Sequence, residues 1–469
     1  MNKKKLAVPH VYILLLALIL ICSLLTYIIP AGQYDMKTIT VAETGAQRSV
    51  VDASTYHTVD PTPVTLMQFL TSVPRGMQEA AQIIFFLFIL GGSMNVLTST
   101  HAIDAGVGRL IQKMRGSSIA LVPVFCVLFS VCGATFGMCE ETIAFVPIFV
   151  PIFMAMGFDS MTGAGIVLCG CAAGYAAAFL NPFNVGVAQG IAELPLGSGM
   201  GFRIVMFICM TIATTLFMLA YALKVKKNPE KSLMYEADKH RENSMNLEDL
   251  PQFGGREKAI LTVFAASIIL LIVGVVKLGW YIDELAALFF GMSIVVGVIA
   301  KGVGFNRYAE LFSQGLADMA AGALVVGIAR GVLVVMTDGQ ILHTILHGAA
   351  TLLSDLPAAV SAVGMYIFQC LLNFIVPSAS GQAAVSIPIM APLGDLVEVS
   401  RQTTVIAFQL GDGISNILTP TSGYFMAALA AGKIPWAKWA KWILPLIGIQ
   451  YLVGLVFVIA AQLINLGPF

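Results

Sequence analysis

Two adjacent acidic residues, Glu140 and Glu141, interrupt a long apolar region in the stretch GMCEETIAFVPIFVP, residues 137–151. A charged side chain at the centre of a bilayer costs at least about 2.5–3.5 kcal/mol on insertion scales unless it is protonated or has a partner. Two interpretations stay open. In the first, one carboxylate forms a salt bridge with Arg330, which we expect to be the only arginine within an apolar span. In the second, one carboxylate faces a substrate or coupling cation, while the other is satisfied by polar groups of the protein.

Further polar residues fall where the sequence predicts breaks in membrane helices. Asp412 is a third carboxylate, expected at the same depth as the glutamate pair. Asn181 and Asn184 either cap the helix ends beside a proline or contact substrate, and the small hydroxyls of the second hairpin also allow close helix packing. The candidate substrate- or ion-binding residues are Glu140, Glu141, Thr142, Asn181, Asn184, Ser378, Ser380, Gln382, Asp412, Asn416, Thr419, Thr421 and Ser422.

The composition places these residues in a polytopic membrane protein. Hydrophobic residues make up 58% and charged residues 11% of the 469 positions, and the mean hydropathy is +0.87, which is far from the usage of soluble domains. The 26 basic and 26 acidic residues cancel, so no global field favours nucleic acid. The eight cysteines lie almost wholly in apolar runs and are expected to pack, not to form a disulfide or metal framework. Apolar runs of about 20 residues, long enough to cross a bilayer as helices, cover 11–29, 79–97, 202–224, 258–277, 282–300, 319–336 and 442–463.

Basic residues mark the loops that we expect on the cytoplasmic side. The basic residues 3–5 precede the first apolar run, which is long and lacks an Ala-x-Ala site, so we expect an uncleaved span with a cytoplasmic N terminus. The polar stretch 33–61, poor in Lys and Arg, is expected outside. Further basic clusters, expected inside, fall within 109–115, 224–256, 301–307 and 433–441.

An internal repeat relates the two halves of the chain. The segment ETIAFVPIFVP aligns with QAAVSIPIMAP, so that Pro147 and Pro388 lie 241 positions apart. Two more pairs, AAFLNPFNVG with SNILTPTSGY and ILGGSMNVLT with IARGVLVVMT, are offset by 238 and 239 positions. Each half predicts a re-entrant helical hairpin and a transmembrane helix broken beside a proline. Because the span at 258–277 has no counterpart in the first half, it inverts the second half relative to the first.

We therefore predict an all-α polytopic membrane protein with two inverted-topology repeats. The first repeat covers 1–223, with a hairpin at 118–156 and a broken helix at 161–190; a charged cytoplasmic linker covers 224–257; the connecting helix and second repeat cover 258–469, with a hairpin at 357–398 and a broken helix at 403–430. This organisation is typical of secondary transporters with a site at the bilayer midplane. A continuous polar stripe, as in a channel, is not visible, and GxSxG, HExxH and GxxxxGK[ST] motifs are absent from the sequence, so an enzyme is not expected.

Three segments carry a family resemblance: FGMCEETIAFVPIFVPIFMAMGFDSM, AAFLNPFNVGVAQGIAELPLGSGMGFR and GIARGVLVVMTDGQILHTIL. They resemble the YfcC-like branch of the family that also holds the anaerobic C4-dicarboxylate carrier and the ArcD-type arginine/ornithine exchangers, and the resemblance covers nearly the whole chain. It implies membership of the ion transporter superfamily, whose better-known members are dimers that move a transport domain like an elevator. That superfamily often binds sodium at the hairpin tips through a Ser-Asn-Thr motif, and the tips here, GMCEET and PSASGQA, depart from it.

The predicted function is secondary active transport of a small metabolite. Three buried acids against one arginine favour a substrate with a positive group, and the resemblance implies the same, so we expect exchange of basic amino acids such as arginine and ornithine. The alternative is a sodium- or proton-coupled symporter of a C4-dicarboxylate or short-chain carboxylate, held by Arg330 and helix amide ends. No cofactor is expected, and the coupling ion is open between H⁺ and Na⁺ at the hairpin tips. The expected setting is a bacterial cytoplasmic membrane, and the expected partners are the metabolite, the bilayer and a second copy of the chain, without nucleic acid.

Overall fold

The structure is a computed structural model that describes residues 11–40, 47–52, 54–103, 105–106, 118–135, 137–195, 197–241, 253–278, 280 and 282–467. It is mainly helical. The helices are α1 (Val11–Leu25), α2 (Leu66–Glu79), α3 (Ala81–Thr98), α5 (Leu121–Thr135), α6 (Thr142–Ala155), α7 (Ser160–Ala176), α8 (Val187–Ile191), α9 (Met200–Lys227), α10 (Tyr235–Lys239), α11 (Gly255–Leu278), α12 (Ile282–Ile299), α13 (Phe305–Asp338), α14 (Leu342–Ser354), α15 (Ala358–Leu372), α16 (Ala379–Leu396), α17 (Arg401–Ser415), α18 (Gly423–Ala431) and α19 (Trp436–Leu463).

Short strands occupy the polar stretch between α1 and α2, for which the sequence predicts a place outside but no strands. They are β1 (Gly32–Gln33), β2 (Met36–Thr40), β3 (Gln47–Val51) and β4 (His57–Thr58). Within the described residues they form two antiparallel pairs, β1 with β4 and β2 with β3. Outside the apolar helices these backbone groups need partners, and pairing of Thr- and Val-containing segments supplies them. The expectation of an all-α chain is corrected to a mainly helical chain with two small sheets.

The long apolar helices agree with the composition of a membrane protein. In the part of the chain that the structure describes, six helical segments are long and apolar enough to cross a membrane: Ala81–Thr98, Ser118–Thr135, Met200–Lys227, Ile282–Ile299, Phe305–Asp338 and Trp436–Leu463. The predicted runs at 11–29 and 258–277 also form helices, α1 and α11. The run predicted at 319–336 is the second half of α13, which has 34 residues because no proline interrupts it from residue 305 onward.

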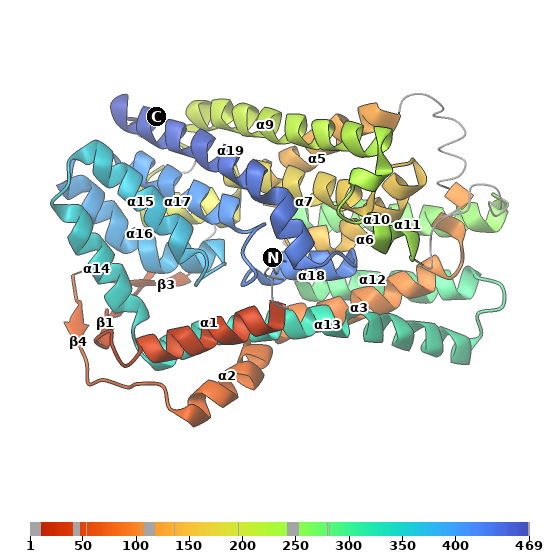
Figure 1. Cartoon of the computed structure of the whole chain (residues 1–469), viewed down its shortest axis with the longest axis horizontal. Helices are drawn as coiled ribbons and strands as arrows, with labels where there is room; N and C mark the ends of the chain where they lie inside the picture. The colour runs from red at the N-terminus through yellow and green to blue at the C-terminus, as the bar shows by residue number, and fades with distance from the viewer. Residues whose placement is uncertain are drawn as a thin grey trace, which may run out of the picture.

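The helices pack in two groups. In the α13 group, α13 contacts α1, α2 and α3, and α3 contacts α12. In the α7–α17 group, α7 packs on α5, α6 and α9, α17 packs on α15, α16 and α19, and α7 and α17 contact each other. Figure 1 shows α1, α3 and α13 along the lower side of the molecule, and α9 and α19 along the upper side. Helix α18 joins the groups, because it contacts both α6 and α13.

Two helices of the α7–α17 group are interrupted near the middle of the molecule. Helix α7 ends at Ala176, and a π-helical turn, Pro182–Gly186, leads into α8. Helix α17 ends at Ser415, and α18 begins at Gly423. These segments coincide with the helices that the sequence predicts to be broken, and the pairs α5–α6 and α15–α16 coincide with the two predicted hairpin segments. The interrupted helices touch where a Cβ on Gly413 would lie 2.4 Å from the Ala176 Cα, a space that only glycine fits.

Candidate functional site

A cavity of about 260 Å³ lies where the segments directly before α6 and α16, which the sequence predicts to be hairpin tips, meet the second interrupted helix. The α7–α17 group contributes the tip before α6, the tip before α16 and the segment after α17. The α13 group contributes α13 and the end of α2. The polar and charged residues that line the cavity are Glu79, Glu140, Glu141, Arg330, Ser378, Ser380, Asn416 and Thr421, with Tyr175, Phe183, Trp280 and Tyr424 among the aromatic ones.

The acidic pair lies at the first tip, directly before α6. Both Glu140 and Glu141 line the cavity. Glu141 is only 8% exposed, and its Oε2 accepts a hydrogen bond from the Cys139 amide at 2.9 Å. Glu141 is the residue directly before α6, at the amide end of the helix, where the helix dipole favours negative charge. Thr142 is buried and donates to the Cys139 carbonyl at 2.5 Å, so this candidate shapes the tip and does not line the cavity.

The second tip contributes hydroxyl groups and no charge. Ser378 and Ser380 line the cavity. Gln382, which the repeat aligns with Glu141, lies outside the cavity lining: it is fully buried in the first turn of α16, and its Nε2 donates to Gln369 Oε1 at 2.8 Å and to the Gln369 carbonyl at 3.0 Å. The two aligned positions therefore differ in place as well as in charge.

Asp412 is held in a buried cage of amides behind the cavity. Its carboxylate is fully buried and accepts hydrogen bonds from Asn184 Nδ2 at 2.8 Å, Asn373 Nδ2 at 3.0 Å and Asn416 Nδ2 at 3.2 Å. The three asparagines come from the segment after α7, the end of α15 and the end of α17. Of this network only Asn416 lines the cavity, so Asp412 joins the interrupted helices from behind it.

The remaining candidates at the helix breaks make local contacts. The Asn181 Oδ1 accepts from the backbone amides of Phe183 and Asn184 at 2.9 and 3.2 Å, which is the capping role that the sequence left open. Thr421 lines the cavity and donates to the Phe374 carbonyl at 2.8 Å, while Thr419 bonds Thr421 at 2.8 Å. Ser422 is buried, and its hydroxyl has no hydrogen-bond partner among the described residues.

Arg330 forms its ion pair with a different acidic residue from the two adjacent glutamates that the sequence suggests. Arg330 Nε donates to Glu79 Oε2 at 2.9 Å, so the structure corrects the expected salt bridge to the adjacent glutamates. Arg330 is also not the only arginine in an apolar span, because Arg203 lies fully buried in the first turn of α9. Sequence reasoning missed Glu79 because it is the first residue of an apolar run, where a charge is ordinary.

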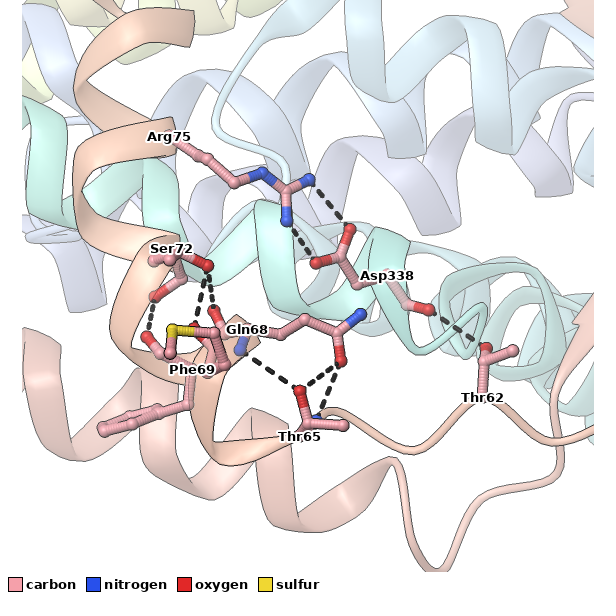
Figure 2. Close-up of polar contacts among 9 residues, drawn as sticks. Thr62, Thr65, Gln68, Phe69, Ser72, Arg75 and Asp338 are labelled. Atoms are coloured by element: carbon pink, nitrogen blue, oxygen red, sulfur yellow. Dashed lines mark hydrogen bonds and ion pairs between the residues drawn. The ribbon is translucent and has the colours of Figure 1, made fainter.

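Helix α2 places Glu79 beside Arg330. One helical turn earlier, Arg75 forms a two-point ion pair with Asp338 at the end of α13, and Thr62 donates to the Asp338 carbonyl at 3.0 Å (Figure 2). Between the two ion pairs the helices touch closely, since a Cβ on Gly76 would lie 2.4 Å from the Gly327 carbonyl oxygen. Residues four apart lie on one face of a helix, so the end of α2 presents Glu79 to the cavity.

Comparison with known proteins identifies the family. The model of the C4-dicarboxylate anaerobic carrier family, DcuC, matches residues 8–463. The "Putative basic amino acid antiporter YfcC" of Escherichia coli (strain K12) is 37% identical over 494 residues, covering 98% of this chain and 97% of that protein. An uncharacterized protein of Haemophilus influenzae is 29% identical over 499 residues, with 98% and 97% of the two chains covered.

Two solved transporter structures are also similar. The Alcanivorax borkumensis YdaH transporter has a TM-score of 0.44 and 16% identity, covering 97% of this chain and 99% of that chain. The antimetabolite efflux pump MtrF of Neisseria gonorrhoeae has a TM-score of 0.42 and 16% identity, covering 97% and 95%. Similarity at these TM-scores is too low to carry a conclusion about the helix arrangement. The sequence match spans nearly the whole chain, and the protein therefore belongs to the C4-dicarboxylate anaerobic carrier family of membrane transporters.

Proposed function

We propose that this transporter exchanges basic amino acids, such as arginine and ornithine, across a bacterial cytoplasmic membrane. The observation that supports this proposal most is the charge of the described part of the cavity lining, where Glu79, Glu140 and Glu141 stand against one guanidinium, that of Arg330. A negative lining that is partly removed from water favours a cationic ligand. The name of the relative YfcC points to the same class of substrate.

A second candidate is a sodium- or proton-coupled symporter of a C4-dicarboxylate or short-chain carboxylate. It is favoured by the description of the family and by Arg330 with Ser378 and Ser380, which together can hold a carboxylate. The two candidates need opposite net charges on the substrate. Substrate charge therefore separates them.

The order of elements supports the proposal of two inverted repeats with re-entrant hairpins. In each half a helix, a tip, a second helix and an interrupted helix follow one another, as α5, α6, α7 and α8 and as α15, α16, α17 and α18. On this proposal the α7–α17 group moves against the α13 group like an elevator, in a homodimer with its N terminus in the cytoplasm. The cavity lies between these groups, where such a movement exposes it to each side in turn.

Proton coupling is the form of exchange that the acidic pair suits best. Glu141 carries the negative charge that would hold a cationic substrate, and its protonation removes that charge. Protons and a cationic substrate would then compete for the same carboxylate. Sodium at the hairpin tips is the alternative, and it predicts a dependence of uptake on sodium instead of pH.

The test is counterflow in proteoliposomes loaded with unlabelled substrate. We expect labelled L-arginine to enter vesicles loaded with L-ornithine and not vesicles loaded with succinate. Glu141→Gln should abolish this exchange, and in the wild type the apparent affinity for arginine should weaken as the pH falls. The matched control is Glu310→Gln, also on a membrane helix, because Glu310 is 60% exposed and pairs only at the surface with Arg307 at 3.0 Å.

The outcomes separate the candidates. Exchange of succinate or fumarate, with no response to arginine, would replace the amino acid proposal by the carboxylate symporter. Normal arginine exchange by Glu141→Gln would show that the acidic pair is structural. Uptake that needs sodium and ignores pH would assign the coupling to sodium.

A further inference from the structure

Among the described residues that line the cavity, Arg330 is the cationic side chain opposite the two acidic residues of the first tip. Arg330 lies on α13 and its side chain is 40% exposed, while Glu140 and Glu141 belong to the tip before α6. Arg330 and the acidic tip therefore come from different helix groups, whereas Glu79, the third acid of the lining, belongs to the same group as Arg330. A ligand that reaches both carries a negative group at one end and a positive group at the other.

The ion pair between Arg330 and Glu79 is not required to hold α2 against α13. Arg75 and Asp338 already join the two helices through two hydrogen bonds (Figure 2), and the backbones pack directly at Gly76 and Gly327. The Arg330 pair adds a second ion pair between the same two helices, and both of its residues also line the cavity. Its place is therefore better explained by binding than by helix packing.

The geometry of the guanidinium leaves it able to bind a second carboxylate. The bond to Glu79 uses Nε, and Nη1 and Nη2 carry four further N–H donors. Two parallel N–H donors on a planar fork match the two oxygens of a carboxylate. Glu79 thus fixes the plane of the guanidinium in the cavity.

We propose that Arg330 binds the carboxylate of the substrate, with Glu79 as the residue that orients it, while the acidic tip binds the cationic end. This inference rests on the proposed exchange of basic amino acids. It narrows the substrate class: the transporter binds and transports cationic amino acids and rejects the corresponding amines, which lack the carboxylate. An amine has no carboxylate to accept hydrogen bonds from Arg330, so its binding would leave these donors unpaired. Unpaired polar groups of this kind give a polar site its strongest discrimination.

The experiment compares L-arginine with agmatine, its decarboxylated amine, as unlabelled competitors of labelled arginine in the same proteoliposomes. In the wild type we expect agmatine to compete at least about tenfold less well than arginine, since a hydrogen bond to a charged group contributes roughly tenfold or more. Arg330→Gln should weaken competition by arginine at least about tenfold and change competition by agmatine by less than about twofold. The discrimination between the two compounds should then disappear.

Two further variants make the result specific. Arg330→Lys keeps the charge but loses the fork, and we expect it to recover part of the discrimination. Arg307→Gln, on the same helix and exposed, removes an arginine outside the cavity and should leave both competition curves unchanged. Size-exclusion profiles of the purified variants show whether each one is folded; if Arg330→Gln is not, the comparison is made with Arg330→Lys.

Retained discrimination in a folded Arg330 variant would overturn the assignment of Arg330 while leaving the exchange of basic amino acids intact. Equal competition by agmatine and arginine in the wild type would do the same. A wild type that exchanges no basic amino acid would refute the proposed function, and the assignment of Arg330 to their carboxylate with it.

Discussion

Replacement of Asp412 tests whether the amide cage behind the cavity holds the two interrupted helices together. Asp412→Ala removes the acceptor of three hydrogen bonds, from Asn184, Asn373 and Asn416, at 2.8–3.2 Å. Hydrogen bonds to a charged group contribute about 1.5–3 kcal/mol each. The loss is offset in part, because burying a carboxylate costs several kcal/mol and the variant avoids that cost.

The net effect should be destabilising. The three asparagine Oδ1 atoms have no hydrogen-bond partner within the described residues. The variant therefore leaves the side-chain amides of Asn184 and Asn416 without the Asp412 acceptor, while Asn373 keeps its bond to the carbonyl of residue 412 at 2.8 Å. Removing one member of a buried charged network typically lowers the free energy of unfolding by about 3–5 kcal/mol. We therefore expect the apparent Tm of the purified protein to fall by roughly 3–5 °C.

The assay is thermal unfolding in detergent, followed by intrinsic fluorescence. Asp412→Asn keeps the shape and one acceptor oxygen, and it should fall between Asp412→Ala and the wild type. The control is Asp318→Asn, because Asp318 is 54% exposed and its ion pair with Lys433 is at the surface. A Tm for Asp412→Ala within about 2 °C of the wild type would show that Asp412 does not hold the two interrupted helices together.

Two further predictions concern the α2–α13 contact and the strands next to α14. Gly76→Ala should lower the free energy of unfolding by about 1–3 kcal/mol, because the new Cβ would lie 2.4 Å from the Gly327 carbonyl oxygen and 2.7 Å from the Gly331 amide nitrogen. The control is Gly348→Ala in α14, where no atom lies within 4 Å of the new Cβ. Equal Tm values for the two variants would contradict the packing argument. Burial lowers the pKa of His343, in α14 outside the six candidate spans, below its ordinary 6.5, and its Nδ1 accepts from the Tyr34 amide at 3.1 Å. Position 343 therefore binds more protons in the unfolded chain than in the folded protein, and stability should fall as the pH drops through about 6.5. We expect His343→Gln to reduce this pH dependence of the Tm, measured between about pH 7.5 and 5.5. An unchanged pH dependence in the variant would exclude His343 as the source of the effect.

Local signals let the sequence predict where helices lie near the site. Helices α15 and α16 fall within 357–398, and α17 and α18 cover nearly the same residues as 403–430. That these segments form a re-entrant hairpin and a broken transmembrane helix stays a prediction. Apolar runs set the helices, and Pro182 prevents a continuous α7 because it has no amide hydrogen. The acidic pair at the first tip is visible for the same reason, since two charges in an apolar run stand out.

Contacts between distant residues could not be predicted in this way. Glu79 and Arg330 are 251 residues apart, and no local pattern relates them. The sequence predicts Asp412 at the same depth as the glutamate pair, but its environment depends on three asparagines from three segments. Arg203 begins a membrane helix, where sequence alone suggests an exposed interfacial charge, and only the packing shows that it is buried.

The proposed movement of the two helix groups past each other fits the distribution of polar contacts. Within the α7–α17 group, Asp412 joins α17 to α15 and to the segment after α7 through fully buried hydrogen bonds, which are costly to break. Across the boundary, Lys433 after α18 pairs with Asp318 of α13 at 3.2 Å, and both side chains are more than half exposed. An exposed ion pair of this kind contributes about 0–1 kcal/mol and can be exchanged for water at little cost.

The same boundary contains a second cavity of about 630 Å³, lined by residues of α3, α6 and α13, so part of the boundary is not closely packed. Rigid groups with a weak boundary are what an elevator movement needs, and a substrate held by Arg330 on one side and the acidic tip on the other would have to release Arg330 before the tip could move.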